Sequence, residues 1–346
     1  MIEGGISVSL LSRRIYQPRL IMILTLSALL ASSSIIIGIA SQKIISARAD
    51  SGKNTSQHVF IIMMENTGYD HLIGNEHAPW VNAAAKTYGL ATNYFGVAHP
   101  SQPNYIGITA GATAGVASDA NMTVDIPNIV DQLEGHGKTW KAYMQSLFAD
   151  GNTNKLADSA GNQLYERKHN PFVSYKDIQD SPRRMENIVD LNQLHTDLAN
   201  NSVPNYVWIS PDQCHDMHGR FSLDPTDMCS FFHEDDVIAA GDAFLHNAVT
   251  KIMTSRAWNS NSVIFITWDE SDLPFLDMSG CCDATPGGGH VITLVISHAG
   301  HPAHTSSVSY NHYSLLATIE DSWKLGCLAN TCDTTTVRPM NDLIGL

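Results

Sequence analysis

The sequence predicts an α/β sandwich built on a largely parallel sheet, and two observations support this prediction. Short apolar runs rich in Val, Ile and aromatic residues alternate with longer segments in which apolar residues recur near the helical period. The runs lack strict apolar–polar alternation, which is typical of strands buried on both faces. Of the 346 residues, 43% are hydrophobic and 16% are charged, so the composition excludes general disorder and allows a sizeable core.

The predicted elements alternate along the chain, as a mainly parallel sheet with crossover helices requires. Strands are predicted at 58–64, 205–210, 262–268 and 290–297. Helices are predicted at 80–88, 127–133, 185–198, 234–256 and 313–325. No internal repeat is evident and no long linker follows the short polar stretch at 49–57, so residues 50–346 are predicted to form one domain.

The N-terminus carries the pattern of an export signal. Three arginines precede an apolar run at 20–40, and the small residues Ala47 and Ala49 frame a cleavage site. Residues 1–49 are therefore interpreted as a signal peptide, or as a signal anchor because a run of this length could span a bilayer. Either form places residues 50–346 outside the cytoplasm, secreted or extracytoplasmic. Membrane attachment is predicted only through an uncleaved anchor at 20–40.

All six cysteines lie in the exported part of the chain, where disulfides are favoured over a metal site. Cys327 with Cys332 and Cys214 with Cys229 are plausible pairs, but six cysteines allow 15 pairings. The adjacent cysteines at 281 and 282 are left unassigned.

The predicted exported part is strongly acidic. Residues 50–346 contain 15 basic and 33 acidic residues, which gives a net charge of −18. A nucleic-acid partner is therefore not expected, because such binding depends on neutralising phosphates with Lys and Arg.

Polar residues follow three of the predicted strands, at the ends where ligand sites form in open α/β sheets. Glu65 and Asn66 follow the first strand, residues 212–218 follow the second, and Asp269 and Glu270 follow the third. Their carboxylate and amide oxygens suit a divalent cation such as Mg, Ca or Mn, or Zn if histidines join. The alternative is that these residues only cap the helices that follow.

Ser101 precedes a predicted helix start. Pro103 suits the first helical position, which places Ser101 at or just before the N-cap. One interpretation is that Ser101 only caps the helix. The other is that the helix N-terminus binds an anion, so that the Ser101 hydroxyl attacks phosphorus beside a metal while Asn104 donates to a phosphoryl oxygen.

Seven ordered motifs resemble the bacterial and fungal phosphoesterase family, whose members include secreted acid phosphatases and phospholipases C. The motifs are Met-Met-Glu-Asn at 63–66, His-Pro-Ser-x-Pro-Asn-Tyr at 99–105, Lys-His-Asn-Pro-Phe at 168–172, Asp-Met-His at 216–218, Thr-Trp-Asp-Glu at 267–270, Gly-Gly-Gly-His-Val at 287–291, and the segment from Tyr-Asn-His-Tyr to Glu-Asp at 310–321. The resemblance covers about 58–325.

The family is similar to the alkaline-phosphatase superfamily, so the resemblance implies a three-layer α/β/α sandwich and a hydroxyl nucleophile that is transiently phosphorylated. Ser101 occupies the nucleophile position. The implied metal ligands are Glu65, Asn66, Ser101, Asp269 and Glu270. The implied phosphate-binding residues are Asn104, His169, His218 and His290. The role of His215 and Asp216 is left open, because His215 stands where the family often has Asn.

The leading functional hypothesis is an exported, metal-dependent phosphoric ester hydrolase acting as an acid-phosphatase-like phosphomonoesterase on a small phosphate ester. One alternative is a phospholipase C-type phosphodiesterase, although residues 67–70 lack the Arg-Ser-Phe that usually follows Glu-Asn in those enzymes. The other alternative is an exported, non-catalytic binding protein stabilised by the metal. The acidic charge predicts a higher kcat/KM on soluble phosphomonoesters than on phosphatidylcholine vesicles.

Overall fold

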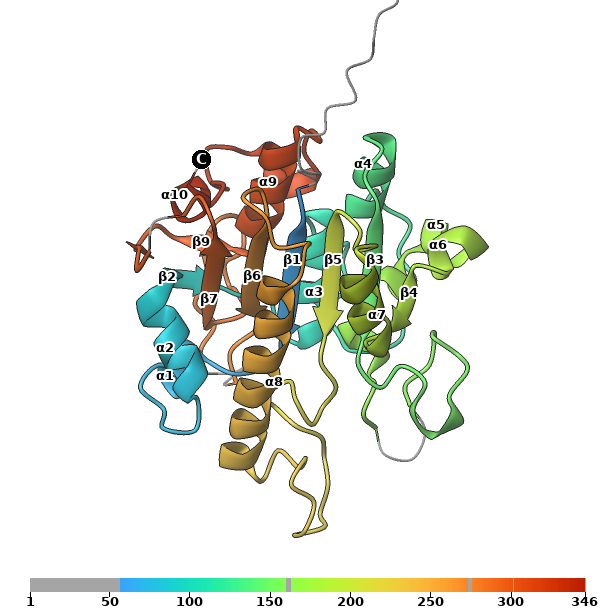
Figure 1. Ribbon diagram of the computed structural model, residues 1–346, viewed down its shortest axis with the longest axis vertical. Helices are drawn as coiled ribbons and strands as arrows, with labels where there is room; N and C mark the ends of the chain where they lie inside the picture. The colour runs from blue at the N-terminus through green and yellow to red at the C-terminus, as the bar shows by residue number, and fades with distance from the viewer. Residues whose placement is uncertain (1–56, 160–162, 273–275, 301, 346) are drawn as a thin grey trace, which may run out of the picture. The chain divides into compact units, whose positions relative to one another are not determined.

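A computed structural model describes residues 57–159, 163–272, 276–300 and 302–345 (Figure 1). These residues belong to one compact unit, Gly52–Leu346. The predicted export segment, 1–49, lies outside the described residues and stays a prediction. Within the described part of the chain, no helix has both the length and the apolar character needed to cross a membrane.

The strands of the described residues form one nine-stranded sheet in the order β4-β3-β5-β1-β6-β7-β2-β8, with β9 also pairing with β2. The strands are β1 Val59–Met64, β2 Gly89–Phe95, β3 Trp140–Met144, β4 Ile188–Asp190, β5 Tyr206–Ser210, β6 Val263–Trp268, β7 His290–Ser297, β8 Thr305–Ser306 and β9 Tyr310–Asn311. Among the strands of the described residues, β7 alone is antiparallel to both of its neighbours, β6 and β2. The carboxyl ends of β3, β5, β1, β6 and β2 therefore share one edge of the sheet, and the predicted largely parallel sheet is confirmed.

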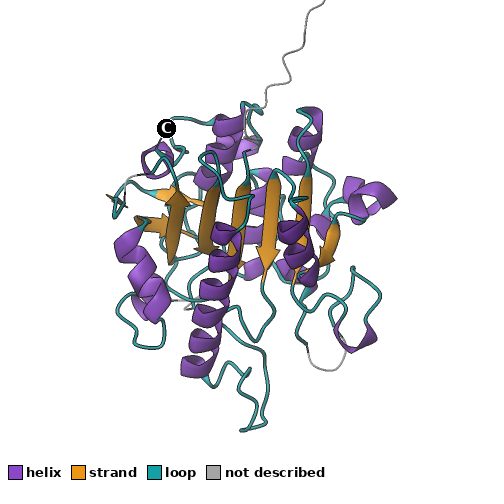
Figure 2. Cartoon of the chain, viewed as in Figure 1, coloured by secondary structure: helices purple, strands orange, loops and turns teal. Residues whose placement is uncertain are grey.

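Helices cover both faces of the sheet, as Figures 1 and 2 show with α7 and α8 in front of the strands and α3 behind them. Helices α2 and α7 pack against α8, while α9 packs against α3. The longer helices are α2 Pro79–Thr87, α3 Ser101–Ala110, α4 Ile129–Gly135, α7 Asn192–Asn200, α8 Glu234–Thr254 and α9 His312–Trp323. The short ones are α1 Tyr69–Leu72, α5 Lys176–Gln179, α6 Pro182–Met185 and α10 Asn341–Ile344, with 3₁₀ turns η1 Ala149–Gly151, η2 Arg167–His169, η3 Pro171–Ser174 and η4 Ala329–Cys332.

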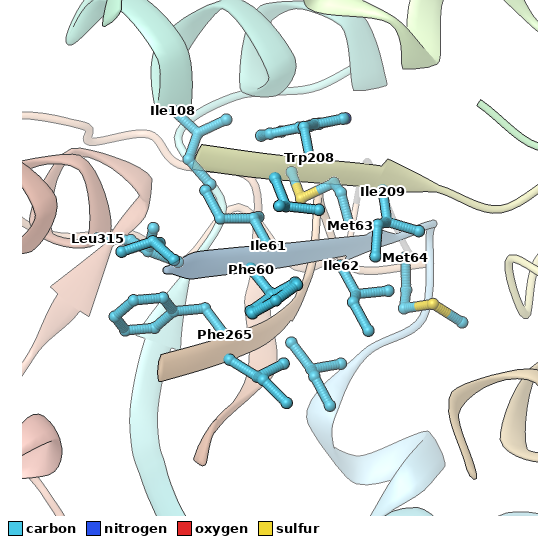
Figure 3. Close-up of a cluster of buried hydrophobic side chains, with 14 of the residues drawn as sticks. Phe60, Ile61, Ile62, Met63, Met64, Ile108, Trp208, Ile209, Phe265 and Leu315 are labelled. Atoms are coloured by element: carbon cyan, nitrogen blue, oxygen red, sulfur yellow. The ribbon is translucent and has the colours of Figure 1, made fainter. Parts of the chain in front are cut away.

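The core is centred on β1, which lies between β5 and β6. Every residue of β1 is at most 1% exposed, because its side chains project alternately into the helical layers on the two faces. Figure 3 shows these side chains on both sides of the strand, among Trp208 of β5 and Phe265 of β6. Burial on both faces explains why the strand reads as a continuous apolar run.

One predicted helix, 185–198, is wrong. The chain there forms the end of α6, the three-residue strand β4, and then α7. Residues of β4 pair with β3, so that Val189 lies opposite Tyr143. Helical spacing is present in the apolar residues of this segment, Ile188, Leu191, Leu194 and Leu198. Ile188, however, belongs to β4 and pairs with β3. The other predicted helices and all four predicted strands are confirmed, with ends that differ by at most two residues.

The structure contains both disulfides that the sequence favoured, Cys214–Cys229 and Cys327–Cys332. The adjacent residues Cys281 and Cys282, which the sequence left unassigned, are bonded to each other.

Candidate active site

Four carboxyl groups meet at the carboxyl edge of the sheet because their strands are neighbours. Glu65 directly follows β1, Asp269 and Glu270 follow β6, and Asp216 lies in the loop after β5. The Glu65 amide donates to the Asp216 carbonyl at 3.0 Å, and the Asp269 amide donates to the Met64 carbonyl at 3.1 Å. All four acidic residues are at most 2% exposed. These carboxyl groups therefore lie together at the carboxyl ends of the strands, where ligand sites form in open α/β sheets.

Ser101 is the first residue of α3, and Pro100 is the N-cap. The predicted placement, with Ser101 at the N-cap and Pro103 at the first helical position, is thus shifted by one to two residues. The Ser101 side chain makes no capping hydrogen bond, because the N-cap position belongs to Pro100. Instead its Oγ lies 2.7 Å from Glu65 Oε1 and 2.9 Å from Glu270 Oε1. A hydroxyl has one proton, so Ser101 can donate to only one of these two carboxylates at a time. Helix capping explains neither contact.

Asn66 links the two strand ends. Its backbone amide donates to Asp269 Oδ1 at 2.8 Å, and its Nδ2 lies 3.1 Å from Glu65 Oε1 and 3.5 Å from Ser101 Oγ. Its φ of 36° is in the left-handed region, which Asn tolerates better than most residues. The structure therefore brings together all five residues that were predicted to bind the metal, although about 200 residues separate them in the sequence. Their binding of a metal stays a prediction.

Three nitrogen-bearing side chains surround these carboxyl groups. Lys168 Nζ lies 3.0 Å from Asp119 Oδ2, 3.4 Å from Ser101 Oγ and 3.5 Å from Glu65 Oε1. The His169 ring contacts Glu65 Oε2, and the His99 ring contacts Glu270 Oε2. Sequence reasoning assigned no role to Lys168 or His99. Both residues lie in motifs on which the family resemblance rests, at 99–105 and 168–172, and this position in the motifs could have marked them as site residues.

The pKa values show an excess of carboxyl groups over cations. Burial would raise the pKa of Glu65, but His169 and Lys168 outweigh it and lower the pKa below its usual value. Burial, followed by the charge of Glu65, raises the pKa of Asp216 to about 7 and that of Asp269 well above its usual value. Burial also raises the pKa of Glu270. Unless a further cation is bound, these raised pKa values favour the protonated, neutral form of Asp216, Asp269 and Glu270.

The donor set fits a divalent cation. Asp216 Oδ2 and Asp269 Oδ2 are buried without a hydrogen-bond partner among the described residues, and carboxylate oxygens are the ligands that Mg, Ca and Mn prefer. One ligand atom each from Glu65, His169 and Asp216 also lie within 4.8 Å of one another. This triad shares only Glu65 with the predicted ligand set. Asp216, whose role the sequence left open, therefore becomes a further candidate ligand.

Asn104 holds the backbone that leads to Ser101. Its Oδ1 accepts from the amides of Val97 and Ala98 at 2.7 and 3.1 Å, and its Nδ2 donates to the carbonyls of Ala98 and Pro100 at 2.7 and 3.2 Å. The same loop passes close to β6, because a Cβ on Gly96 would lie 2.7 Å from the Asp269 carbonyl oxygen. Substrate binding by Asn104 stays a prediction.

The three predicted substrate-binding histidines occupy different environments. His169 lies in the cluster itself and stacks on Tyr105, with ring centroids 5.3 Å apart. His218 stacks on Phe231 at 6.1 Å, and burial lowers its pKa although Glu65 opposes the shift. His290 stacks on Tyr69 at 4.5 Å, and its Nε2 lies 2.9 Å from the Thr92 carbonyl oxygen. Of the three, only His169 directly contacts Glu65, and substrate binding by all three stays a prediction.

Comparison with known proteins decides the family. The model of the Phosphoesterase family matches residues 75–326, which is well over half of the chain. The chain belongs to this family. The predicted family is therefore confirmed. The predicted class of enzyme, a hydrolase acting on phosphoric esters, agrees with the family, and the activity of this chain itself stays a proposal.

This phosphoesterase is similar to curated proteins from fungi and bacteria. It is 24% identical over 291 residues to the phosphate-repressible acid phosphatase of Penicillium chrysogenum, covering 82% of this chain and 63% of that protein. It is 27% identical over 299 residues to the phosphatidylinositol-3-phosphatase of Mycobacterium tuberculosis, covering 86% of each. The chain spans only 55–63% of the length of the fungal acid phosphatases that it matches.

Among solved structures, the phosphonate monoester hydrolase of Agrobacterium radiobacter is similar with a TM-score of 0.55 and 14% identity, over 84% of this chain and 77% of that one. At this identity the likeness shows the fold alone. The predicted α/β/α fold is confirmed by this likeness and by the layers described above.

Proposed function

We propose that this phosphoesterase hydrolyses phosphoric monoesters outside the cytoplasm, with Ser101 as the nucleophile and a divalent metal as cofactor. The observation that carries the proposal is the position of Ser101 Oγ, within 2.9 Å of carboxylate oxygens of both Glu65 and Glu270 at the start of α3. Two ionised carboxylates that face the same hydroxyl repel each other unless a positive charge lies close to both. A nucleophilic hydroxyl needs this environment, whereas a capping serine does not.

The residues around Ser101 supply most of the required roles. The hydroxyl loses its proton to one of the carboxylates that it contacts, and Oγ forms a bond to phosphorus as the bond between phosphorus and the ester oxygen breaks. The carboxyl group then returns the proton to the leaving oxygen, which departs as the alcohol. Lys168 and His169 neutralise charge that develops on the phosphoryl oxygens. A metal held by Glu65, Asn66, Ser101, Asp269 and Glu270 would lower the pKa of the Ser101 hydroxyl. Water then hydrolyses the phosphoserine, which releases phosphate and restores the hydroxyl.

Two findings support the finer parts of the proposal. The relatives from Penicillium chrysogenum and Mycobacterium tuberculosis both carry phosphatase names, which favours monoesters over the diesters cleaved by phospholipases C. All six cysteines are paired in disulfides, which supports an oxidising compartment and agrees with the predicted export segment.

The test is hydrolysis of p-nitrophenyl phosphate and bis-p-nitrophenyl phosphate by the purified full chain, with chelator and after adding back single metals. We expect the monoester to be the better substrate, the chelator to abolish turnover, and Ser101→Ala to do the same without unfolding the protein. Faster cleavage of the diester would favour the phospholipase C alternative. Metal-dependent stability without any turnover would favour the non-catalytic binding protein.

A further inference from the structure

Among the described residues, the large apolar side chains that are exposed lie at the edge of the sheet that holds Ser101. Eight large apolar side chains are exposed among the described residues, and all eight lie in loops that follow β3, β5 or β6. Because these three strands run in parallel, the loops share the carboxyl edge. Single exposed apolar residues are ordinary, but their confinement to one edge marks an interaction surface.

Half of these side chains belong to one loop, 211–233, between β5 and α8. They are Phe221, Leu223, Met228 and Phe232, with exposures of 61%, 77%, 52% and 60%, and we call them the apolar tip. In Figure 1 this loop extends below the carboxyl ends of the strands, to the bottom of the view. Its side chains can therefore reach a flat surface presented to this edge.

Loop 211–233, which carries the apolar tip, is stabilised by bonds between its own residues. The Cys214–Cys229 disulfide closes it, and Arg220 forms an ion pair with Asp227 at 3.0 Å. The Arg220 amide donates to the Cys229 carbonyl at 2.8 Å, and the Phe231 amide donates to the Arg220 carbonyl at 2.9 Å. Because the loop is already ordered, binding through the tip loses little conformational entropy.

A chain of ring contacts connects the tip to the candidate active site. Phe231 lies 4.2 Å from Phe232 and 5.8 Å from Phe221 between ring centroids, and it stacks on His218. His218 follows Asp216 by two residues, and the charge of Glu65 acts on its pKa. A surface that contacts the tip is therefore one aromatic ring away from a predicted phosphate-binding residue.

The charge around the tip selects among lipid surfaces. Residues 211–236 contain seven acidic residues, whereas Arg220 is their single Lys or Arg and is paired with Asp227. The exposed acidic residues Glu234, Asp235 and Asp236 open α8 beside the tip, and the ion pairs found for them are with histidines. This distribution opposes docking on strongly anionic membranes and favours surfaces that present choline ammonium groups.

We propose that the apolar tip docks on a phosphatidylcholine-rich lipid surface and delivers lipid phosphomonoesters to the Ser101 site. The proposal rests on the proposed phosphatase function and names its substrate class: lipids whose headgroup ends in a phosphate monoester. It adds a route to the membrane besides the predicted N-terminal anchor. The phosphatidylcholine itself is the surface, and its diester bonds are not cleaved.

The first test measures contact at the tip directly and independently of activity. Full-length Phe232→Trp is mixed at pH 7 with phosphatidylcholine vesicles that contain brominated acyl chains, which quench nearby tryptophan. The matched control is Ala199→Trp, an exposed position near the end of α7 at the opposite edge of the sheet. We expect additional quenching over wild type for Phe232→Trp and none for Ala199→Trp. Equal quenching of both probes, or of neither, would overturn the docking proposal.

The second test compares kcat/KM on phosphatidic acid diluted in phosphatidylcholine vesicles with kcat/KM on p-nitrophenyl phosphate. Leu223→Asp places a carboxylate on the tip, and Ala199→Asp adds the same charge at the opposite edge. We expect Leu223→Asp to lower the vesicle rate about tenfold and the soluble rate less than twofold, because a carboxylate resists entry into the apolar interface. Ala199→Asp should leave both rates within about twofold.

The outcomes separate the two proposals. Unchanged vesicle rates in Leu223→Asp, with normal hydrolysis of the soluble ester, would overturn docking and leave the phosphatase function standing. Tip-specific quenching in a protein that hydrolyses neither ester would overturn the function and leave docking standing. A concentration-dependent dimer that Leu223→Asp dissociates, without quenching by lipid, would show that a second copy of the chain covers the tip.

Discussion

A buried carboxyl group that is not part of the candidate active site makes a specific prediction about pH. Glu320 of α9 is 3% exposed, and its Oε1 accepts from Gln132 Nε2 at 2.9 Å. Burial outweighs its hydrogen bonds and raises its pKa from 4.5 to about 7. Between these values the folded state keeps a proton that the unfolded chain releases, so the stabilisation is complete below pH 4.5 and is lost as the pH rises through 7.

The expected size follows from the shift. About 2.5 pH units at 1.36 kcal/mol per unit correspond to about 3 kcal/mol of unfolding free energy lost between pH 4.5 and pH 8. Glu320→Gln removes the titration and keeps a hydrogen-bond acceptor for Gln132. We therefore expect the variant to match wild type near pH 4.5 and to exceed it at pH 8 by up to about 3 kcal/mol.

Urea unfolding at the two pH values measures this double difference. Asp321→Asn, at the exposed neighbouring position on α9, is the control for an equal change of charge. The part of the effect that is specific to Glu320 is the change in unfolding free energy of Glu320→Gln beyond that of Asp321→Asn. A Glu320→Gln variant with the same advantage at both pH values, or one less stable than wild type at pH 8, would refute the reasoning.

Three further predictions concern the site and its loop. Lys168→Met should lower kcat/KM about 100-fold by removing a cation 3.4 Å from Ser101 Oγ, and steady-state kinetics beside Lys168→Arg would show whether charge is responsible. Asp269→Asn should weaken divalent-metal binding at least about tenfold in calorimetric titration, and unchanged affinity would remove Asp269 from the ligand set. Replacing Cys214 and Cys229 with Ser should lower the unfolding free energy by about 3 kcal/mol, because the disulfide spans 15 residues; urea unfolding with no loss would contradict this.

The sequence predicted the strands of the sheet centre because burial on both faces requires continuous apolar runs. It missed β3, β8 and β9, and it missed β2, whose Thr92 and Asn93 interrupt the apolar pattern. It also missed β4, whose three residues fit a helical spacing equally well. The direction of β7 is antiparallel because the chain returns directly from β6 to its neighbour. The residues of β7 themselves do not indicate the direction of the strand.

The candidate site was predictable where it depends on strand ends. Glu65, Asp269 and Glu270 follow predicted buried strands, and neighbouring parallel strands bring such residues together. Lys168, His99 and Asp216 lie in turns and loops, so their approach to Ser101 and Glu65 depends on tertiary packing. The same holds for the apolar tip, because its exposure follows from the loop's position at the sheet edge. The acidic composition alone predicts a preference for soluble esters over phosphatidylcholine vesicles, and the docking proposal departs from that prediction because of the exposed apolar tip.

The central claim is that Ser101 attacks phosphorus and forms a phosphoserine. The stereochemical course at phosphorus tests it most directly, using a phosphate monoester made chiral with oxygen isotopes and an alcohol as phosphoryl acceptor. Two successive in-line displacements, the first by Ser101 Oγ, predict retention of configuration. Inversion would show that the acceptor attacks phosphorus directly, and it would contradict a covalent role for Ser101.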